Sequence, residues 1–170
     1  IFWLVWDASS ARVPEAQLAW ARKQLASPQA QGARARFVVG HLPLVGVGQG
    51  KDRPGEVLDK ERALQALMDA AGVQAYISGH HHAWFSSCRG QLDLIQLGAL
   101  GSGPRRLLDG GAPAQQTFTL LEIDAERGTL LEITYAVSSG QPLSWSTLPP
   151  HLCTRAGLLQ RNASKRLLRG

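Results

Sequence analysis

Two apolar stretches of the chain each end in a glycine followed by histidine. Residues 76–82 read Tyr-Ile-Ser-Gly-His-His-His, and residues 37–43 read Phe-Val-Val-Gly-His-Leu-Pro. Because the ligands of an open α/β sheet gather beyond the carboxyl ends of its strands, we expect these histidines to meet at one edge of a sheet. Imidazole is a common ligand of zinc, copper and iron. The pattern therefore predicts a metal site formed by His41, His80 and His82.

The apolar spacing predicts the elements that must position these histidines. Residues 1–6 and 36–39 have the composition of buried strands, and a helix over about 14–25 lies between them. A glycine-rich loop over 45–55 then precedes a second helix over about 56–71. The later strands are predicted over 73–78, 92–97, 116–124 and 129–137, the last two as a hairpin.

Both histidine motifs resemble those of a known family. Val38-Val39-Gly40-His41 resembles the V-x-x-H motif of the calcineurin-like metallophosphoesterases, which include the purple acid phosphatases. Gly79-His80-His81-His82 resembles their G-H-x-H motif, and the two motifs occur in the family order with a predicted helix between them. The resemblance covers about residues 1–145. It implies an α/β fold of the α+β sandwich type, with two mixed β-sheets flanked by helices.

The resemblance also implies a dinuclear metal centre. His41 and His80 would bind one metal ion and His82 the other, with iron, manganese and zinc as the candidate ions. Two neighbouring cations bind a phosphate oxyanion, generate hydroxide from bound water and stabilise an in-line displacement. The implied activity is that of a phosphoric ester hydrolase, and both monoesters and diesters remain open as substrates.

Three further motifs of the family, D-x-H, G-D-x-x-D/Y and G-N-H-E/D, are absent from the chain. In the family they precede V-x-x-H and supply the remaining ligands and a proton-donating histidine. We therefore interpret residues 1–148 as the C-terminal part of a metallophosphoesterase domain whose N-terminal part is missing. No catalytic residue is assigned within this chain. We expect the isolated chain to be inactive, whereas its parent protein hydrolyses phosphate esters.

Three residues near the motifs have both a functional and a structural interpretation. His81 lies between two candidate ligands, and strand alternation would point it away from them. We expect it to be exposed, with a place at the substrate mouth as the alternative. Trp84 would either form a wall of the substrate pocket or belong to the core. Asp7 ends a strand without the histidine of D-x-H, which favours a structural role.

The net charge of +5 comes from the end of the chain. Five of the 18 Lys and Arg residues follow residue 154, where no acidic residue occurs. We expect residues 149–170 to form a basic tail that is solvated and poorly ordered. The alternative is a module whose tail contacts the phosphates of a nucleic acid or a membrane surface, but no specific nucleic acid is predicted.

A second alternative is a structural or regulatory module that binds a single zinc ion. Cys88 could complete a set with His41, His80 and His82, because thiolate and imidazole are good zinc ligands, although the spacing matches no standard zinc signature. No apolar run approaches the length of a membrane span. Any signal sequence would precede residue 1, so a periplasmic or extracellular localisation and a cytoplasmic one both remain open, as does the oligomeric state.

Overall fold

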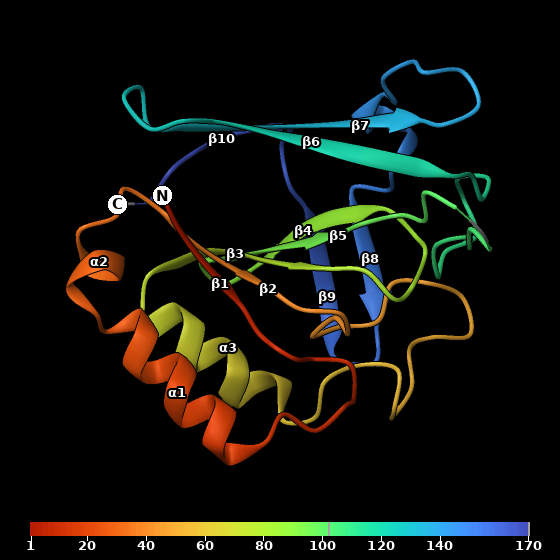
Figure 1. Ribbon diagram of the computed structural model, residues 1–170. Coiled ribbons are helices and arrows are strands. Elements are labelled where there is room, and N and C mark those ends of the chain that lie inside the picture. The colour runs from red at the N-terminus through yellow and green to blue at the C-terminus, as the bar shows by residue number, and fades with distance from the viewer. Residues whose placement is uncertain (102, 170) are drawn as a thin grey trace.

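The computed structural model describes residues 1–101 and 103–169, which form three layers (Figure 1). A large sheet lies in the middle, two helices cover one of its faces, and a small sheet covers the other. The large sheet has seven strands in the order β1-β2-β3-β5-β4-β9-β8, and the small sheet has three in the order β10-β7-β6. The predicted sandwich of two sheets flanked by helices is confirmed, with the small sheet antiparallel throughout.

The boundaries of the elements are as follows. The large sheet contains β1 (Phe2–Val5), β2 (Arg36–Val39), β3 (Val73–Ser78), β4 (Phe85–Arg89), β5 (Leu92–Gln96), β8 (His151–Thr154) and β9 (Gly157–Arg161). The small sheet contains β6 (Thr117–Asp124), β7 (Thr129–Ala136) and β10 (Lys165–Leu167). The helices are α1 (Glu15–Leu25), α2 (Pro28–Gln31), α3 (Glu61–Ala70) and the 3-10 helix η1 (Trp145–Thr147). In the described part of the chain, no helix has the length and apolar composition needed to cross a bilayer.

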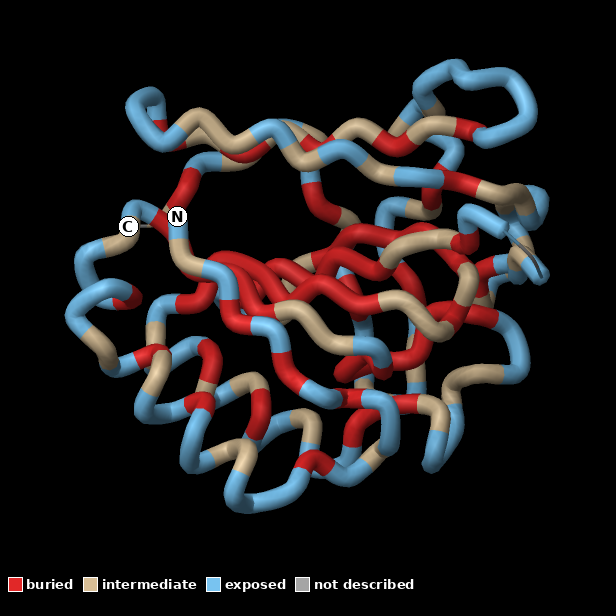
Figure 2. Tube along the Cα trace, in the orientation of Figure 1, coloured by how far each residue is buried: buried red, intermediate tan, exposed pale blue. Residues whose placement is uncertain are grey.

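Strands β1, β2, β3 and β5 are parallel neighbours in the large sheet. Parallel strands need crossover connections, and here α1 joins β1 to β2 and α3 joins β2 to β3. Every residue of β3 and β5 is buried, as expected for parallel strands covered on both faces (Figure 2). This arrangement brings the carboxyl ends of β2 and β3, and the histidines that follow them, to the same edge.

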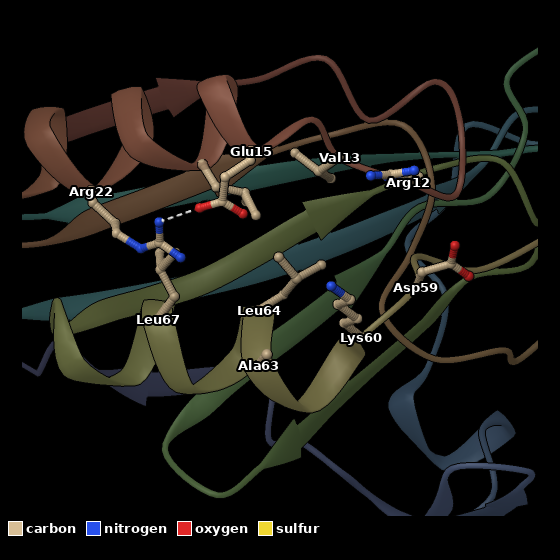
Figure 3. Close-up of a pocket in the computed structure, with 10 residues that line it drawn as sticks. Arg12, Val13, Glu15, Arg22, Asp59, Lys60, Ala63, Leu64 and Leu67 are labelled. Atoms are coloured by element: carbon tan, nitrogen blue, oxygen red, sulfur yellow. Dashed lines mark hydrogen bonds and ion pairs between the residues drawn. The ribbon is translucent and has the colours of Figure 1, made fainter.

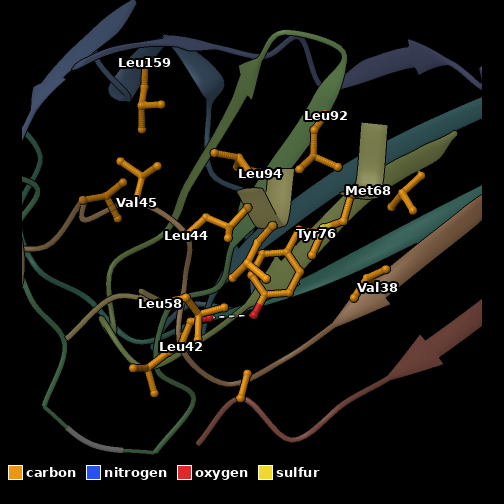
Figure 4. Close-up of a cluster of buried hydrophobic side chains, with 14 of the residues drawn as sticks. Val38, Leu42, Leu44, Val45, Leu58, Met68, Tyr76, Leu92, Leu94 and Leu159 are labelled. Atoms are coloured by element: carbon orange, nitrogen blue, oxygen red, sulfur yellow. Dashed lines mark hydrogen bonds between the residues drawn. The ribbon is translucent and has the colours of Figure 1, made fainter. Parts of the chain in front are cut away.

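The main core lies between the large sheet and the helices (Figure 4). Leu64 and Met68 of α3 face the sheet, and Tyr76 of β3 lies beneath them with only 1% of its surface exposed. The Tyr76 hydroxyl donates a hydrogen bond of 2.7 Å to the carbonyl of Leu42, which fastens the chain after β2 to β3. A smaller core between the two sheets contains Ala35, Phe37, Ala75, Ile77, Ile95, Leu130 and Leu168.

One helix boundary differs from the sequence prediction, and one short helix was not predicted. Helix α3 begins at Glu61 rather than near residue 56, and the residue before it, Lys60, has a left-handed backbone with φ 56°. The turn over 51–56 is instead held by contacts of Glu56 with Lys51 and the histidine site. Pro28 begins the short helix α2, which Ser27 caps by accepting a hydrogen bond from the Ala30 N–H at 3.2 Å.

The expectation of a solvated, poorly ordered basic tail is wrong, because residues 151–167 form three strands. Strands β8 and β9 form a hairpin that extends the large sheet beside β4, and β10 pairs with β7 of the small sheet. Leu152 and Leu159 are 1% and 2% exposed, so the hairpin contributes to the core. Gly170, the last residue of the predicted tail, lies outside the described residues. The assignment of residues 1–148 to part of a larger domain stays a prediction.

Candidate metal centre

The two Gly-His strand ends lie side by side at the carboxyl edge of the large sheet. His41 follows β2, His80 follows β3, and the N–H of Gly79 donates to the carbonyl of His41 at 3.1 Å. Glycine is required at position 40, because a Cβ there would overlap the hydroxyl of Tyr76. The glycine of the first motif therefore allows the two strand ends to approach each other closely.

His41 and His80 are in direct contact. Nδ1 of His80 lies 3.1 Å from Nε2 of His41, and the ring planes cross at 72°. When two imidazole nitrogens each bind the same zinc ion at about 2.0–2.1 Å, the usual angles between neighbouring ligands place the two nitrogens about 3.0–3.4 Å apart. The observed separation falls in that range and also suits an N–H···N hydrogen bond. The pair therefore fits two adjacent ligand positions on one metal ion.

The surroundings of His41 favour its neutral form. Partial burial lowers the pKa of His41, and the positive charges that His80 and His82 can carry lower it further. A histidine must be neutral to give a lone pair to a metal ion. Partial burial and the two neighbouring imidazoles thus favour the form of His41 that a metal ion would require.

Glu56 belongs to the site, although the sequence did not predict it. Its Oε2 lies 2.6 Å from Nε2 of His80, and Lys51 and Arg53 contact the same carboxylate at 2.7 and 3.2 Å. The hydrogen bond from Lys51, followed by that from His80, lowers the pKa of Glu56 to about 2. Helical spacing had placed Glu56 inside the next helix, and the available signal was an acidic residue in the loop before α3, one of three together with Asp52 and Asp59.

His80 and His82 both have left-handed backbones, with φ of 63° and 52°. Such angles are uncommon for residues other than glycine and cost free energy, and they are concentrated at functional sites. The turn is held in place by two hydrogen bonds: the N–H of Arg105 donates to the carbonyl of His82 at 2.9 Å, and Nδ1 of His82 lies 3.1 Å from the carbonyl of Gly103. The rest of the fold thus maintains a strained turn that carries two of the predicted ligands.

The expectation that His81 is exposed is wrong, because its side chain is fully buried. The Val47 N–H donates to Nδ1 of His81 at 3.2 Å, and the opposite nitrogen, Nε2, lies 2.9 Å from the carbonyl of Glu56. Burial lowers the pKa of His81 to about 4, so the ring is neutral near pH 7. The strand ends at Ser78, and the turn after it, not strand alternation, directs His81 into the interior.

Trp84 and Asp7 both have structural surroundings. Trp84 is 7% exposed and belongs to the main core, and its indole N–H donates to Oε1 of Glu132 at 3.2 Å. Asp7 accepts hydrogen bonds from the backbone N–H and the hydroxyl of Ser9 at 3.0 and 2.6 Å, which lower its pKa. For Trp84 the core interpretation fits the burial, and Asp7 forms a local turn at the end of β1.

Within residues 1–101 and 103–169, no three His, Cys, Asp or Glu side chains converge on one metal position. His82 therefore does not join His41 and His80 in a three-ligand set. Cys88 lies in β4, opposite Asp93 of β5, and belongs to no such group. A closed zinc site of four protein ligands is not formed by these residues, and the single-zinc alternative is not favoured.

A cavity of about 520 Å³ lies between α1 and α3 and has a mixed lining (Figure 3). Val13 and Leu64 contribute apolar surface, while Arg12, Asp59 and Lys60 contribute charge. None of the histidines lines this cavity. The candidate site at the strand ends is therefore defined by the chemistry of its side chains and not by the shape of this cavity.

The chain is similar to known phosphatases in sequence and in fold. Over 151 residues it is 28% identical to tartrate-resistant acid phosphatase type 5 of Rattus norvegicus, covering 81% of this chain and 43% of that protein. Among solved structures, a purple acid phosphatase, PPD1 from yellow lupin (Lupinus luteus) seeds, has a TM-score of 0.68 at 16% identity and covers 84% of this chain and 30% of that chain.

A second similar fold is that of GAP50, the anchor in the inner membrane complex of Plasmodium, with a TM-score of 0.67 at 19% identity over 84% of this chain and 47% of that one. No family model matches the chain. Fold and similarity together define a metallophosphoesterase-like domain. Its sequence is similar to that of an acid phosphatase, and it spans less than half the length of each of these relatives.

Proposed function

We propose that this chain supplies the histidine ligands of a dinuclear metal centre that hydrolyses phosphate esters. The observation that carries the proposal is the contact of 3.1 Å between His41 and His80 at adjacent strand ends, with His82 two residues further on. His41 and His80 bind one ion, and His82 binds the second. The similarity to an acid phosphatase supports the reaction class.

The chemistry at the site divides between the metal ions and the protein. When bound, the ions supply a nucleophilic hydroxide and stabilise the charge that develops on the phosphate oxygens. The chain itself orients the ligands: the strained turn presents His80 and His82, and the lowered pKa of His41 keeps its lone pair available. Lys51 and Arg53, beside Glu56, add positive charge near the place where an anionic substrate would bind.

The isolated chain is proposed to bind metal without turning over substrate. A catalytic zinc site has about three protein ligands, whereas His41 and His80 alone provide two at the first position. The remaining ligands and the proton donor would come from a segment with the D-x-H, G-D-x-x-D and G-N-H motifs, which this chain does not contain. We therefore expect no metal-dependent hydrolysis of p-nitrophenyl phosphate by the 170 residues alone.

Cobalt(II) titration of the purified chain, followed by visible absorption, tests the metal site. We expect saturable binding that His41→Ala or His80→Ala weakens by about tenfold or more, because each substitution removes one of two adjacent ligands. Inorganic phosphate should change the spectrum of the cobalt-loaded chain. His151→Ala is the matched control, since His151 is exposed on β8.

Two results would contradict the proposal. Equal cobalt affinity in wild type, His41→Ala and His80→Ala would show that these two histidines do not bind the metal ion. Cobalt binding that Cys88→Ala also weakens would favour a module that binds a single zinc ion. A clean metal-dependent turnover of p-nitrophenyl phosphate by the chain would refute the inactivity expected of it in isolation.

A further inference from the structure

The loop over 45–56 is fastened to the histidine turn at several points. The Val47 N–H donates to Nδ1 of His81 at 3.2 Å, so this nitrogen is an acceptor and the ring carries its proton on Nε2. Nε2–H then donates to the carbonyl of Glu56 at 2.9 Å. His81 thereby joins the two ends of the loop and fixes the backbone of Glu56 beside the turn.

The carboxylate of Glu56 is surrounded by hydrogen-bond donors. Lys51, Arg53 and His80 contact its two oxygens at 2.7, 3.2 and 2.6 Å, and the side chain is only 17% exposed. A carboxylate held by two cationic side chains acts as an acceptor, so the hydrogen bond to His80 requires a proton on Nε2 of that ring. In the neutral ring the lone pair is then on Nδ1, the nitrogen that faces His41.

We propose that Glu56 is a positioning residue that selects the Nε2–H tautomer of His80 and directs Nδ1 toward the metal position shared with His41. Metal-binding histidines commonly donate their other N–H to a carboxylate, which fixes the tautomer and the ring orientation and makes the ligand more basic. Glu56 reaches His80 because the fully buried His81 holds the loop in place. The effect of Glu56 on metal binding rests on the proposed function, whereas the tautomer of His80 can be observed without metal.

A purely structural role for Glu56 has a different pattern of effects. In that case the important contact would be the ion pair with Lys51, and removing either partner would have the same result. Under the positioning role, Lys51→Met leaves the carboxylate and its hydrogen bond to His80 in place. Glu56→Gln removes the charge and introduces an amide that can donate or accept, so the tautomer of His80 is no longer enforced.

The test combines long-range ¹H–¹⁵N correlation spectra of the histidine rings in the metal-free chain with cobalt(II) titration. In wild type and Lys51→Met we expect His80 in the Nε2–H form. In Glu56→Gln we expect a mixture of tautomers and cobalt binding weaker by about 10–100-fold, the usual effect of losing such a partner. Glu15→Gln is the matched control, because Glu15 is exposed and pairs only with Arg22 among the described ion pairs.

The two readouts separate failure of this inference from failure of the proposed function. If wild type binds no cobalt but Glu56→Gln changes the tautomer of His80, the proposed metal site is wrong, whereas the selection of the His80 tautomer by Glu56 is supported. If Glu56→Gln retains both the tautomer and the affinity, Glu56 is not a positioning residue. Equal losses in Glu56→Gln and Lys51→Met would also overturn the inference and assign the ion pair a structural role.

Discussion

Three consecutive histidines have three different environments in this fold. His80 contacts Glu56 and His41, His81 is buried against backbone groups, and His82 lies against the carbonyl of Gly103. The left-handed angles at His80 and His82 turn the backbone between them, so adjacent side chains diverge. Which imidazole is free to bind a ligand is therefore decided by backbone conformation and not by residue type.

Because Tyr76 is buried beside the site, the free energy of unfolding should decrease as the pH becomes alkaline. Burial raises the pKa of Tyr76 well above its usual value near 10, so the folded state keeps the proton that the unfolded state releases. The contribution of Tyr76 to the free energy of unfolding is complete below about pH 10. It falls by about 1.4 kcal/mol for each pH unit above that, until the raised pKa is reached. Tyr76→Phe should remove this slope, as urea unfolding at several pH values can measure.

The same substitution should also destabilise the protein at neutral pH. Tyr76→Phe leaves the carbonyl of Leu42 without its hydrogen bond of 2.7 Å, at a cost of about 1–3 kcal/mol. Tyr135→Phe is the control, because Tyr135 is only partly buried in β7 and should lose less. An unchanged alkaline slope in Tyr76→Phe would mean that another group titrates.

The sequence predicted part of this site for a clear physical reason. Apolar runs that end in Gly-His identify strand ends, and parallel strand ends meet at one edge, so the proximity of His41 and His80 could be predicted. The roles of Glu56 and His81 depend on the path of a loop with four glycines and on a left-handed turn. Neither the loop nor the turn has a periodic apolar pattern in the sequence, so the positions of Glu56 and His81 could not be predicted from it.

At the scale of elements, the C-terminal strands show how charge counting can mislead. Arg166 of β10 contacts Asp93 of β5 at 3.1 Å and Glu132 of β7 at 2.8 Å, and both carboxylates are almost fully buried. Arg169 also contacts Asp93. The acidic partners lie more than thirty residues earlier in the chain, so the local sequence resembles a solvated tail. The parallel strands and the hairpin β6–β7 were predictable because their signals are local.

Removing Arg166 should destabilise both sheets together. Arg166→Met leaves Asp93 and Glu132 without a cation that bridges the two sheets, and breaking a buried pair costs about 3–5 kcal/mol. Urea unfolding measures the loss. Lys165→Met is the control, since Lys165 is exposed on the same strand.

If Arg166→Met does not fold, the double variant Arg166→Met/Glu132→Gln provides the second measurement. It removes the charge of Glu132, the carboxylate that Arg166→Met leaves without a cation while Asp93 keeps Arg169, and should recover part of the lost stability. Equal losses in Arg166→Met and Lys165→Met would show that the ion pairs contribute little.

At the scale of the whole molecule, one edge of the large sheet is apolar and exposed. Strand β1 pairs only with β2 in the described structure, and Trp3 and Val5 are 46% and 67% exposed. Trp3 stacks on Phe37 at 4.6 Å, next to the smaller core between the sheets. An edge strand with unpaired backbone groups and large apolar side chains is a template for association with another strand.

We therefore expect the purified chain to self-associate with rising concentration, and Val5→Lys to reduce this. A lysine on an edge strand opposes pairing by charge, and little packing is lost because Val5 is mostly exposed. Light scattering coupled to size-exclusion chromatography measures the effect. Leu158→Lys is the control, because Leu158 is 64% exposed but lies in β9, which has a partner strand on each side. Equal effects of the two variants would rule out edge pairing.

The two ends of the described chain lie close together at the amino edge of the large sheet (Figure 1). Phe2 pairs with Arg36, Arg36 pairs with Val73, and the Arg169 N–H donates to the side chain of Gln74. Two strand spacings correspond to about 10 Å, a distance that a linker of a few residues can cross. A circular permutant that joins these ends and opens the exposed turn at 138–140 would keep the histidine turn and its supporting loop on an uninterrupted stretch of chain.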